Sequence, residues 1–316
     1  MIKAKDLTRY YGSFCAADHV SFKVSPGEVL GFLGPNGAGK STTMKMLTGF
    51  LNPTFGTSTI CGYDILQNPI AAKQQMGYLP ENGPLYEEMT VLEFLSFVAA
   101  LRDLKDSPSH KAIERGMDIC GLYDVRHQPI ETLSKGFRQR VGMAQAVLHD
   151  PPCLILDEPT DGLDPNQKQQ IRALINQMAA DKAIILSTHI LEEVEATCSR
   201  IIIIDHGKVM IDEPTHQLLK SHPNYNAVRL TLKGKPNPDI RSQLEALSSV
   251  RSVESANDGF LVLPKKETTV YETLWEIAHE QKWPVQELRH EPIRLEKIFA
   301  DLTESGNQAR QIGLGA

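Results

Sequence analysis

The chain has 316 residues, 41% of them hydrophobic and 23% charged, which is the balance of a globular protein with room for about two domains of roughly 100–200 residues each. Its net charge of -6 argues against a general electrostatic attraction to nucleic acid or to an anionic membrane surface. The five cysteines are scattered without a CxxC pair, which disfavours a disulfide framework or a zinc knuckle and fits a reducing compartment.

Alternating strand and helix patterns run from the N-terminus to about residue 221 and predict an α/β core. The N-terminal MIKAKDLTRY has no apolar core, so we expect no secretory signal there, and no apolar run approaches the ~18 residues that cross a bilayer. The predicted strands are the apolar runs at 19–24, 28–34, 153–157, 183–188, 200–205 and 206–213. Several of these runs are unbroken, as expected for strands covered on both faces. From about 90 to 149 the strand signals vanish, and we predict a helical insert.

A second unit follows the linker HPNYN, which begins after residue 221. Its predicted strands are 226–234, 250–256, 259–265 and 285–290, and its predicted helices are 238–249, 267–281 and 294–303. The order βαββαβ is that of a ferredoxin-like α+β domain. Residues 305–316 have the composition of a loose tail. We therefore predict a core at 2–221 and an accessory domain at 226–303.

The first chemical motif consists of Gly34, Pro35, Asn36, Gly37, Ala38, Gly39, Lys40, Ser41 and Thr42, between a predicted strand and a predicted helix. Its three glycines are expected to adopt positive φ angles, so that successive N–H groups cradle phosphate oxygens. Lys40 supplies a point charge for the outer phosphates, and the Ser41 hydroxyl can bind magnesium. The spacing matches GxxxxGK[ST] in full, and the strand–turn–helix context favours a phosphate loop over a glycine-rich surface turn.

Two adjacent carboxylates follow the apolar run at 153–156. Asp157 ends the predicted strand and Glu158 comes directly after it. A buried strand of this kind delivers charge to the carboxyl edge of the sheet, where open α/β folds bind ligands. Asp157 can hold magnesium through water, and Glu158 can polarise an attacking water. An acidic pair that caps the next helix is the alternative, and the phosphate loop in the same chain disfavours it.

Six motifs stand in the order found in the ATP-binding subunits of ABC transporters, and over about residues 2–221 the chain resembles that family. Residues 34–42 resemble Walker A, and residues 133–137 (LSKGF) resemble the signature LSGGQ. Residues 153–158 resemble Walker B with the catalytic glutamate, and residues 161–164 resemble the D-loop. His189 stands in the place of the switch histidine, and Tyr11 resembles the aromatic residue that stacks on adenine. The resemblance implies a P-loop NTPase fold of the ABC type with a helical subdomain at about 90–149. It also implies ATP and Mg²⁺ as ligands.

The resemblance also assigns roles that need a second subunit. In the family, two subunits close face to face around two ATP molecules. Ser134 and the Gly136 N–H are therefore expected to reach a γ-phosphate across the dimer, and Asp164 is expected to reach across the interface. His189 is expected to contact the γ-phosphate and the attacking water. For Tyr11, a core aromatic residue is the alternative to adenine stacking.

Two motifs depart from the commonest family pattern. Glu81, in MGYLPEN, stands where a glutamine usually touches magnesium and the water, so the resemblance groups it with Ser41 and Asp157 as a metal residue. A carboxylate oxygen can take that role, but it adds a negative charge near the γ-phosphate. The signature has Lys135 in place of glycine and Phe137 in place of glutamine.

The expected function is that of an ATPase that drives a membrane transporter. The variant motifs resemble those of bacterial exporters of drugs, polysaccharides and gliding-motility factors. The resemblance implies two partners. One is a separate integral membrane permease, docked near residues 81–89, and the other is a second ATPase subunit, which makes a homodimer. It also implies a position on the cytoplasmic face of the inner membrane. No nucleic-acid partner is expected.

Rival functions remain open from the residues alone. A soluble ABC ATPase acting on ribosomes or DNA is disfavoured by the single set of motifs, the lack of sustained heptads and the acidic charge. A regulatory protein that binds ATP with little turnover is disfavoured by the presence of Glu158 and His189. For the C-terminal unit, RNA binding is disfavoured because the strand at 228–234 lacks stacking aromatic residues, which leaves a regulatory or dimerising role.

Overall fold

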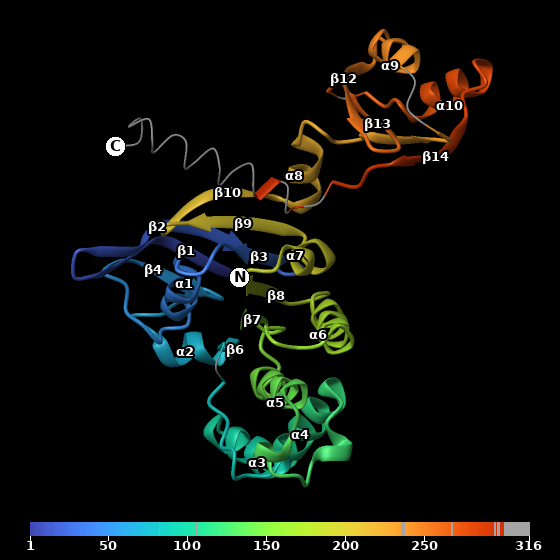
Figure 1. Ribbon diagram of the computed structural model, residues 1–316. Coiled ribbons are helices and arrows are strands. Elements are labelled where there is room, and N and C mark those ends of the chain that lie inside the picture. Colours follow the sequence, from blue (N-terminus) through green and yellow to red (C-terminus); the bar gives the residue numbers. More distant parts are fainter. Residues whose placement is uncertain are drawn as a thin grey trace. The chain divides into compact units, whose positions relative to one another are not determined.

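The computed structural model divides the chain into two compact units, Met1–Thr215 and His216–Ala316 (Figure 1). It describes residues 1–81, 83–104, 106–234, 238–266, 268–293, 295, 298 and 299. Among these residues, no helix combines the length and the apolar character that crossing a bilayer requires.

A six-stranded sheet forms the centre of the first unit, with the strand order β10-β9-β3-β8-β7-β6. Its strands are β3 (Val29–Leu33), β6 (Met76–Leu79), β7 (Cys153–Asp157), β8 (Ala183–Thr188), β9 (Arg200–Asp205) and β10 (Lys208–Pro214). All pairs are parallel except the hairpin of β9 and β10. Every residue of β3, β7 and β8 is buried, which explains their unbroken apolar runs. Because Leu33 pairs with Thr188, and Asp157 with Ser187, the three strands end at one edge of the sheet.

A second, antiparallel sheet has the order β2-β1-β4-β5. Its strands are β1 (Ile2–Tyr11), β2 (Phe14–Val24), β4 (Phe55–Ile60) and β5 (Tyr63–Asp64). The sequence predicted only part of β2 in this sheet. Helix α1 (Lys40–Leu47) contacts strands of both sheets, and its buried Met44 and Leu47 belong to one hydrophobic core that the two sheets share. This packing fixes the helix that follows the phosphate loop.

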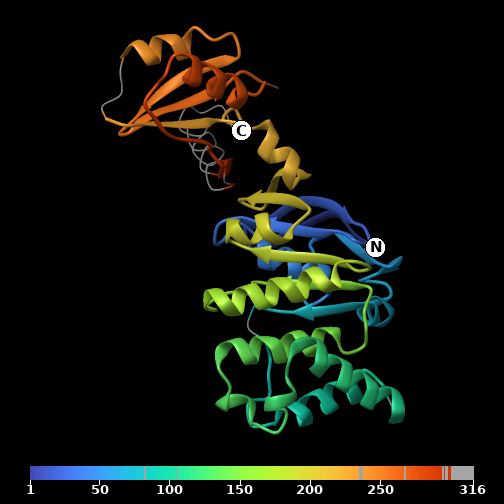
Figure 2. The same ribbon diagram turned by 90° about the vertical axis from the view of Figure 1, so that its right-hand side faces the viewer.

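Helices cover both faces of the six-stranded sheet. Figure 1 shows α1 on one side of it and α6 (Pro165–Met178) and α7 (Leu191–Thr197) on the other. Helix α7 packs on β3 and β8, and Figure 2 shows α6 running across the unit. The close packing of α7 favours a glycine in β3, because a Cβ at Gly31 would lie 3.0 Å from a Val194 methyl carbon.

Residues 90–149 are mainly helical, as predicted. They contain α3 (Val91–Leu101), α4 (Asp106–Cys120) and α5 (Lys135–Val147), with single 3-10 turns at Tyr123–Val125 and Ile130–Thr132, while α2 (Pro69–Gln74) precedes β6. Helix α3 begins at a capping box formed by Thr90 and Glu93. Helix α5 joins this segment to the sheet, because it lies so close to β6 that a Cβ at Gly77 would be 2.0 Å from the Ala146 carbonyl oxygen.

The second unit has the element order βαββαβ, preceded by α8 (Thr215–Ser221), which spans the boundary of the units. Its elements are β11 (Val228–Leu232), α9 (Pro238–Glu245), β12 (Val250–Ala256), β13 (Gly259–Pro264), α10 (Tyr271–Glu280) and β14 (Val285–His290). The strands pair antiparallel in the order β12-β13-β11-β14, which is the connectivity of a split βαβ fold. Apolar side chains of the strands and of both helices form its core.

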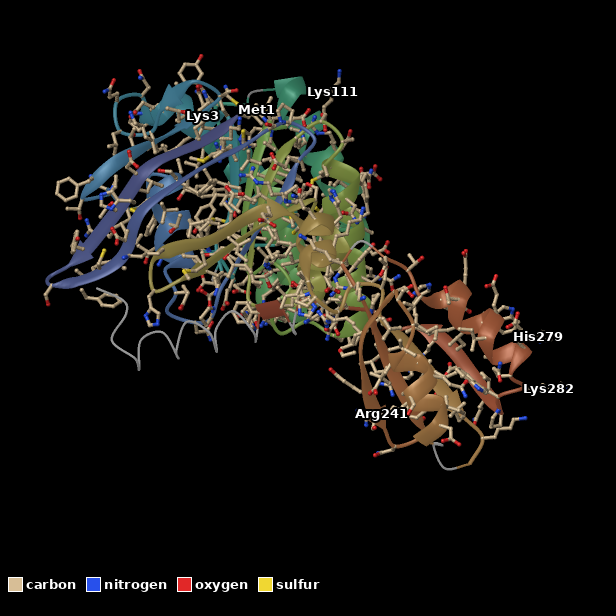
Figure 3. The ribbon with its side chains drawn as sticks, turned by 90° about the horizontal axis from the view of Figure 1, so that it is seen from above. Met1, Lys3, Lys111, Arg241, His279 and Lys282 are labelled. Carbon is tan, nitrogen blue, oxygen red and sulfur yellow. The ribbon has the colours of Figure 1, made fainter. Side chains whose placement is uncertain are left out.

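An ion pair lies on the exposed face of α9. Figure 3 places Arg241 on α9, where its Nε donates to the Glu245 carboxylate at 2.8 Å. The helix predicted at 294–303 falls outside the described residues except at Leu295, Ile298 and Phe299, and the tail at 305–316 lies wholly outside them.

Candidate active site

The phosphate loop connects β3 to α1 at the carboxyl edge of the six-stranded sheet. Gly37 and Gly39 have φ angles of 81° and 103°, as predicted, and a Cβ at Gly39 would lie 2.3 Å from the Ala16 carbonyl oxygen. The prediction of a positive φ for Gly34 was wrong. Gly34 is required for a different reason, because a Cβ there would lie 2.4 Å from the Ile204 carbonyl oxygen.

Lys40 is buried beneath this loop. Its Nζ donates to the Gly34 carbonyl at 2.7 Å and lies 3.8 Å from the Glu158 Oε1. Burial lowers the pKa of Lys40, and the charges of Glu158 and Asp157 oppose that shift. The ammonium group is thus placed between the loop that can cradle phosphates and the two carboxylates at the end of β7, Asp157 and Glu158.

Asp157 ends β7 and is only 1% exposed. Burial raises its pKa, the nearby Ser187 and Ser41 hydroxyls lower it, and the charge of Glu81 raises it further. Among the described atoms, its Oδ1 has no hydrogen-bond partner. A buried carboxylate oxygen without a partner, close to a serine hydroxyl, fits a hard divalent cation such as Mg²⁺.

The described residues contain no ready-made cage for such a cation. No three His, Cys, Asp or Glu side chains among them are grouped so as to hold a metal ion. A magnesium ion bound here would therefore take most of its ligands from phosphate and water oxygens, as magnesium usually does. Ser41, Glu81 and Asp157 are the residues that could complete its coordination.

Glu158 and His189 form a hydrogen-bonded pair. The Glu158 Oε2 lies 3.0 Å from the His189 Nδ1, and the Glu158 N–H donates to the Ser187 carbonyl at 2.9 Å. Burial raises the pKa of the Glu158 carboxyl, and the His189 hydrogen bond opposes the rise. The His189 side chain is 42% exposed, and because its Nδ1 faces Glu158, its Nε2 is the nitrogen left for a ligand.

A cavity of about 640 Å³ joins these groups, and this volume suits a small-molecule ligand. Its lining residues are Tyr11, Phe14, Ala16, Asn36, Gly37, Gly39, Lys40, Ser41, Thr42, Glu81, Glu158, Asp161 and His189. Most of them were singled out from the sequence. Phe14 and Ala16 were missed, because they lie on the hairpin of β1 and β2, which the sequence did not predict.

Tyr11 lies at the end of β1 with 48% of its surface exposed. The guanidinium carbon of Arg9 lies 4.9 Å from the centre of its ring. Arg9 also donates to the Asn52 carbonyl at 2.9 Å, so the cation is itself fixed. A ring held in this way at the cavity wall can stack on a nucleotide base.

Of the signature residues 133–137 and the D-loop residues 161–164, only Asp161 lines this cavity. Ser134 caps α5 by accepting from the Phe137 N–H, and Asp164 caps α6 by accepting from the Gln167 N–H. Gly136 is packed so closely that a Cβ there would lie 2.6 Å from the Gln167 side chain. In one chain these residues cap or pack against the helices, and their contact with a nucleotide across a dimer stays a prediction.

A second cavity, of about 770 Å³, adjoins the first. Ser41 and Glu81 line both cavities, and Asp157 lines the second. Its outer wall carries the exposed apolar side chains of Phe50, Ile70 and Leu101. An apolar surface of this kind, which lines the same cavity as the predicted metal residues, is suited to binding another protein.

Comparisons with known proteins identify the family of the chain. The family model described as ABC transporter matches residues 17–161. The probable multidrug ABC transporter ATP-binding protein YbhF of Escherichia coli is 38% identical over 211 residues, 66% of this chain and 36% of that protein, so the chain spans about a third of that relative's length.

Two further comparisons cover most of the matched protein. The Nod factor export ATP-binding protein I of Ralstonia nicotianae is 30% identical over 304 residues, 96% of this chain and 94% of that protein. A solved structure of the ATP-binding subunit of an ABC transporter has a TM-score of 0.64 and 32% identity, and covers 69% of this chain and 91% of that one. The predicted ABC-type P-loop core is confirmed, and the chain belongs to the ATP-binding proteins of the ABC transporter family.

Proposed function

We propose that this chain is the ATP-hydrolysing subunit of an exporter whose permease is a separate membrane protein. The observation that carries the proposal is the convergence of Lys40, Glu158 and His189 on one cavity at the carboxyl edge of a parallel sheet. The name of one relative, Nod factor export ATP-binding protein I, supports the direction of export, and the name of the other, a probable multidrug ABC transporter ATP-binding protein, supports a role in transport.

ATP binds with its phosphates in the loop of residues 34–42 and its adenine against Tyr11. The loop N–H groups and Lys40 meet the outer phosphates, whose negative charge the N-terminus of α1 also stabilises. Ser41, Asp157 and Glu81 would hold Mg²⁺, which would neutralise charge on the phosphates. This assignment is supported by the unpartnered Oδ1 of Asp157.

Glu158 acts on the water that attacks the γ-phosphate. Its raised pKa brings the carboxylate closer to the proton affinity that a base needs near neutral pH. His189 holds the Glu158 carboxylate through Nδ1 and offers Nε2 to the γ-phosphate. Ser134, Gly136 and Asp164 complete the site from the second copy of the chain in an ATP-bound homodimer.

The second cavity is the proposed docking site for the permease. The permease would place an apolar helix against Phe50, Ile70 and Leu101, near the loop of residues 81–89. Because Glu81 lines both cavities, its position can report the state of the nucleotide to the permease. This docking would keep the chain on the cytoplasmic face of the inner membrane. For the second unit we propose a regulatory or dimerising role.

The test combines catalysis with partner capture. The purified protein is expected to hydrolyse ATP, and Lys40→Ala is expected to abolish tight ATP binding and turnover, because it removes the charge that meets the outer phosphates. Protein purified from membranes is expected to bring an integral membrane protein with it. ATPase activity that persists in Lys40→Ala would contradict the phosphate-loop assignment, and purification without any membrane protein would contradict the transport role.

A further inference from the structure

A buried carboxylate outside all the sequence motifs connects the segments that carry Glu158 and His189. Glu193 lies on α7 and is only 1% exposed. Its Oε2 accepts a hydrogen bond from the Thr160 hydroxyl and another, at 3.4 Å, from the Thr188 hydroxyl. Glu193 does not line the nucleotide cavity, so it touches no ligand there.

The Thr160 contact anchors the turn that begins at Glu158. The Asp161 N–H donates to the Glu158 carbonyl at 3.2 Å, and the Leu163 N–H donates to the Thr160 carbonyl at 3.3 Å. Glu158 itself has a φ of 50°, a left-handed conformation that a glutamate adopts only when its surroundings support it. The bond from Thr160 to Glu193 provides part of that support.

The Thr188 contact anchors the turn that carries His189. The Thr188 hydroxyl oxygen accepts from the Ile190 N–H at 3.1 Å, which closes a turn around His189. The same hydroxyl donates to Glu193, whose own N–H donates to the Ile190 carbonyl at 3.2 Å. Side chain and backbone of Glu193 therefore both hold the histidine segment.

Lys168 balances the charge of this carboxylate. Its Nζ lies 3.5 Å from the Glu193 Oε1, which has no hydrogen-bond partner among the described atoms. Lys168 lies on α6, the helix that Asp164 caps at the end of the D-loop. A buried carboxylate requires such a partner, since an uncompensated charge in the interior is strongly unfavourable.

We propose that Glu193 is a positioning residue for ATP hydrolysis, which holds the Glu158 turn and the His189 turn together and so maintains the 3.0 Å contact between the two side chains. This inference rests on the proposed function. Glu193 acts only through Glu158 and His189, so its loss should impair turnover much more than nucleotide binding.

The first experiment separates turnover from binding. Glu193→Gln keeps the size and one acceptor oxygen but removes the charge opposite Lys168. It is expected to lower kcat about 10²-fold, because a shift of ~1 Å in a catalytic group has an effect of that order. The dissociation constant for adenylyl imidodiphosphate is expected to change less than about threefold, since Glu193 is not among the residues that line the cavity. Glu192→Gln is the matched control, because Glu192 is the exposed residue that precedes Glu193 in α7, and it should leave kcat unchanged.

The second experiment asks whether Glu193 acts through the pair. In a His189→Ala background, Glu193→Gln is expected to lower the single-turnover rate by a smaller factor than in the parent. The contact between Glu158 and His189 is already lost there, and only the support of the Glu158 turn remains to be removed. Thr160→Ser, which keeps the hydroxyl, should restore most of the activity that Thr160→Val loses.

Three outcomes would overturn the inference. The first is a parent-like kcat in Glu193→Gln. The second is that Glu193→Gln lowers the rate in the His189→Ala background by the same factor as in the parent. The third is a fall in kcat together with weaker analogue binding and a lower thermal unfolding midpoint, which would show a purely structural role. A parent protein that hydrolyses no ATP would instead contradict the proposed function itself.

Discussion

Replacing Glu158 with glutamine tests the active site most directly. The substitution keeps the shape of a buried side chain that lies 3.0 Å from the His189 Nδ1 and 3.8 Å from the Lys40 Nζ. It removes the negative charge and the ability to accept a proton from water. Lys40 and the phosphate loop remain intact, so we expect Glu158→Gln to bind ATP and to accumulate as an ATP-bound dimer.

The expected loss of turnover follows from the role of a base. General-base and water-polarising groups contribute about 10²–10⁴-fold to a rate, which raises the activation barrier by about 3–5 kcal/mol. The measurement is the steady-state ATPase rate at saturating ATP and magnesium, with dimer formation followed by light scattering.

The same substitution is expected to stabilise the folded protein although it impairs turnover. Burial raises the pKa of Glu158 in the folded protein, so folding disfavours its charged form. The resulting destabilisation is present at neutral pH and disappears as the pH falls through the raised pKa, because the folded state then binds the proton more tightly than the unfolded state. Glutamine has no such charge, so the variant should unfold at a higher temperature than the parent at pH 7, and the difference should shrink in acid.

Two controls separate these effects from a general change in the fold. Asp157→Asn, at the other carboxyl whose pKa burial raises, should also raise the unfolding temperature at pH 7. Glu192→Gln, on an exposed residue, should change neither the rate nor the unfolding temperature. A Glu158→Gln protein that hydrolyses ATP at the parent rate, or that unfolds at a lower temperature than the parent at pH 7, would refute the reasoning.

Three further predictions concern the metal, the loop and the second unit. Glu81→Gln should raise the magnesium concentration needed for half-maximal ATPase activity while the apparent ATP affinity at saturating magnesium moves less, because it removes an anionic oxygen ligand; superimposable magnesium titrations would remove Glu81 from the site. Gly39→Ala should abolish tight ATP binding, since its φ of 103° and the 2.3 Å approach to the Ala16 carbonyl leave no room for a methyl group, and near-parent binding affinity would disprove this. A chain ending at residue 221 should fold and hydrolyse ATP, because all nucleotide motifs lie in the first unit, and insolubility of that fragment would show that the units depend on a shared core.

The fold was predictable where local sequence determines it. The buried parallel strands at 153–157, 183–188 and 200–205 have the predicted bounds, because a strand covered on both faces must be apolar throughout. The antiparallel sheet was mostly missed. β1 and β4 carry many polar residues and pair with each other across some fifty positions of sequence, so no local pattern marks them.

The candidate site could be predicted from the sequence to a similar degree and for a related reason. Its motifs combine residue types whose chemistry is specific, such as the lysine and glycines of the phosphate loop, and the parallel register brings them to one edge. The reason for Gly34 was not predictable, because it depends on the carbonyl oxygen of Ile204 in another strand. Phe14 and Ala16 depend on a hairpin whose sequence gives no clear strand signal.

Glu193 shows where this kind of reasoning stops. A glutamate on a short helix would normally be read as solvent-exposed, since carboxylates are almost never fully buried unless paired. Its burial has meaning only beside Thr160, Thr188 and Lys168, which come from three other segments. At Glu158, the proposed catalytic residue, the local sequence preference and the observed left-handed backbone disagree. Such a disagreement indicates that distant contacts offset a local energetic cost. The strained glutamate and the buried one are therefore two parts of a single arrangement, and the local conflict at Glu158 is the signal by which a partner such as Glu193 can be sought in related chains.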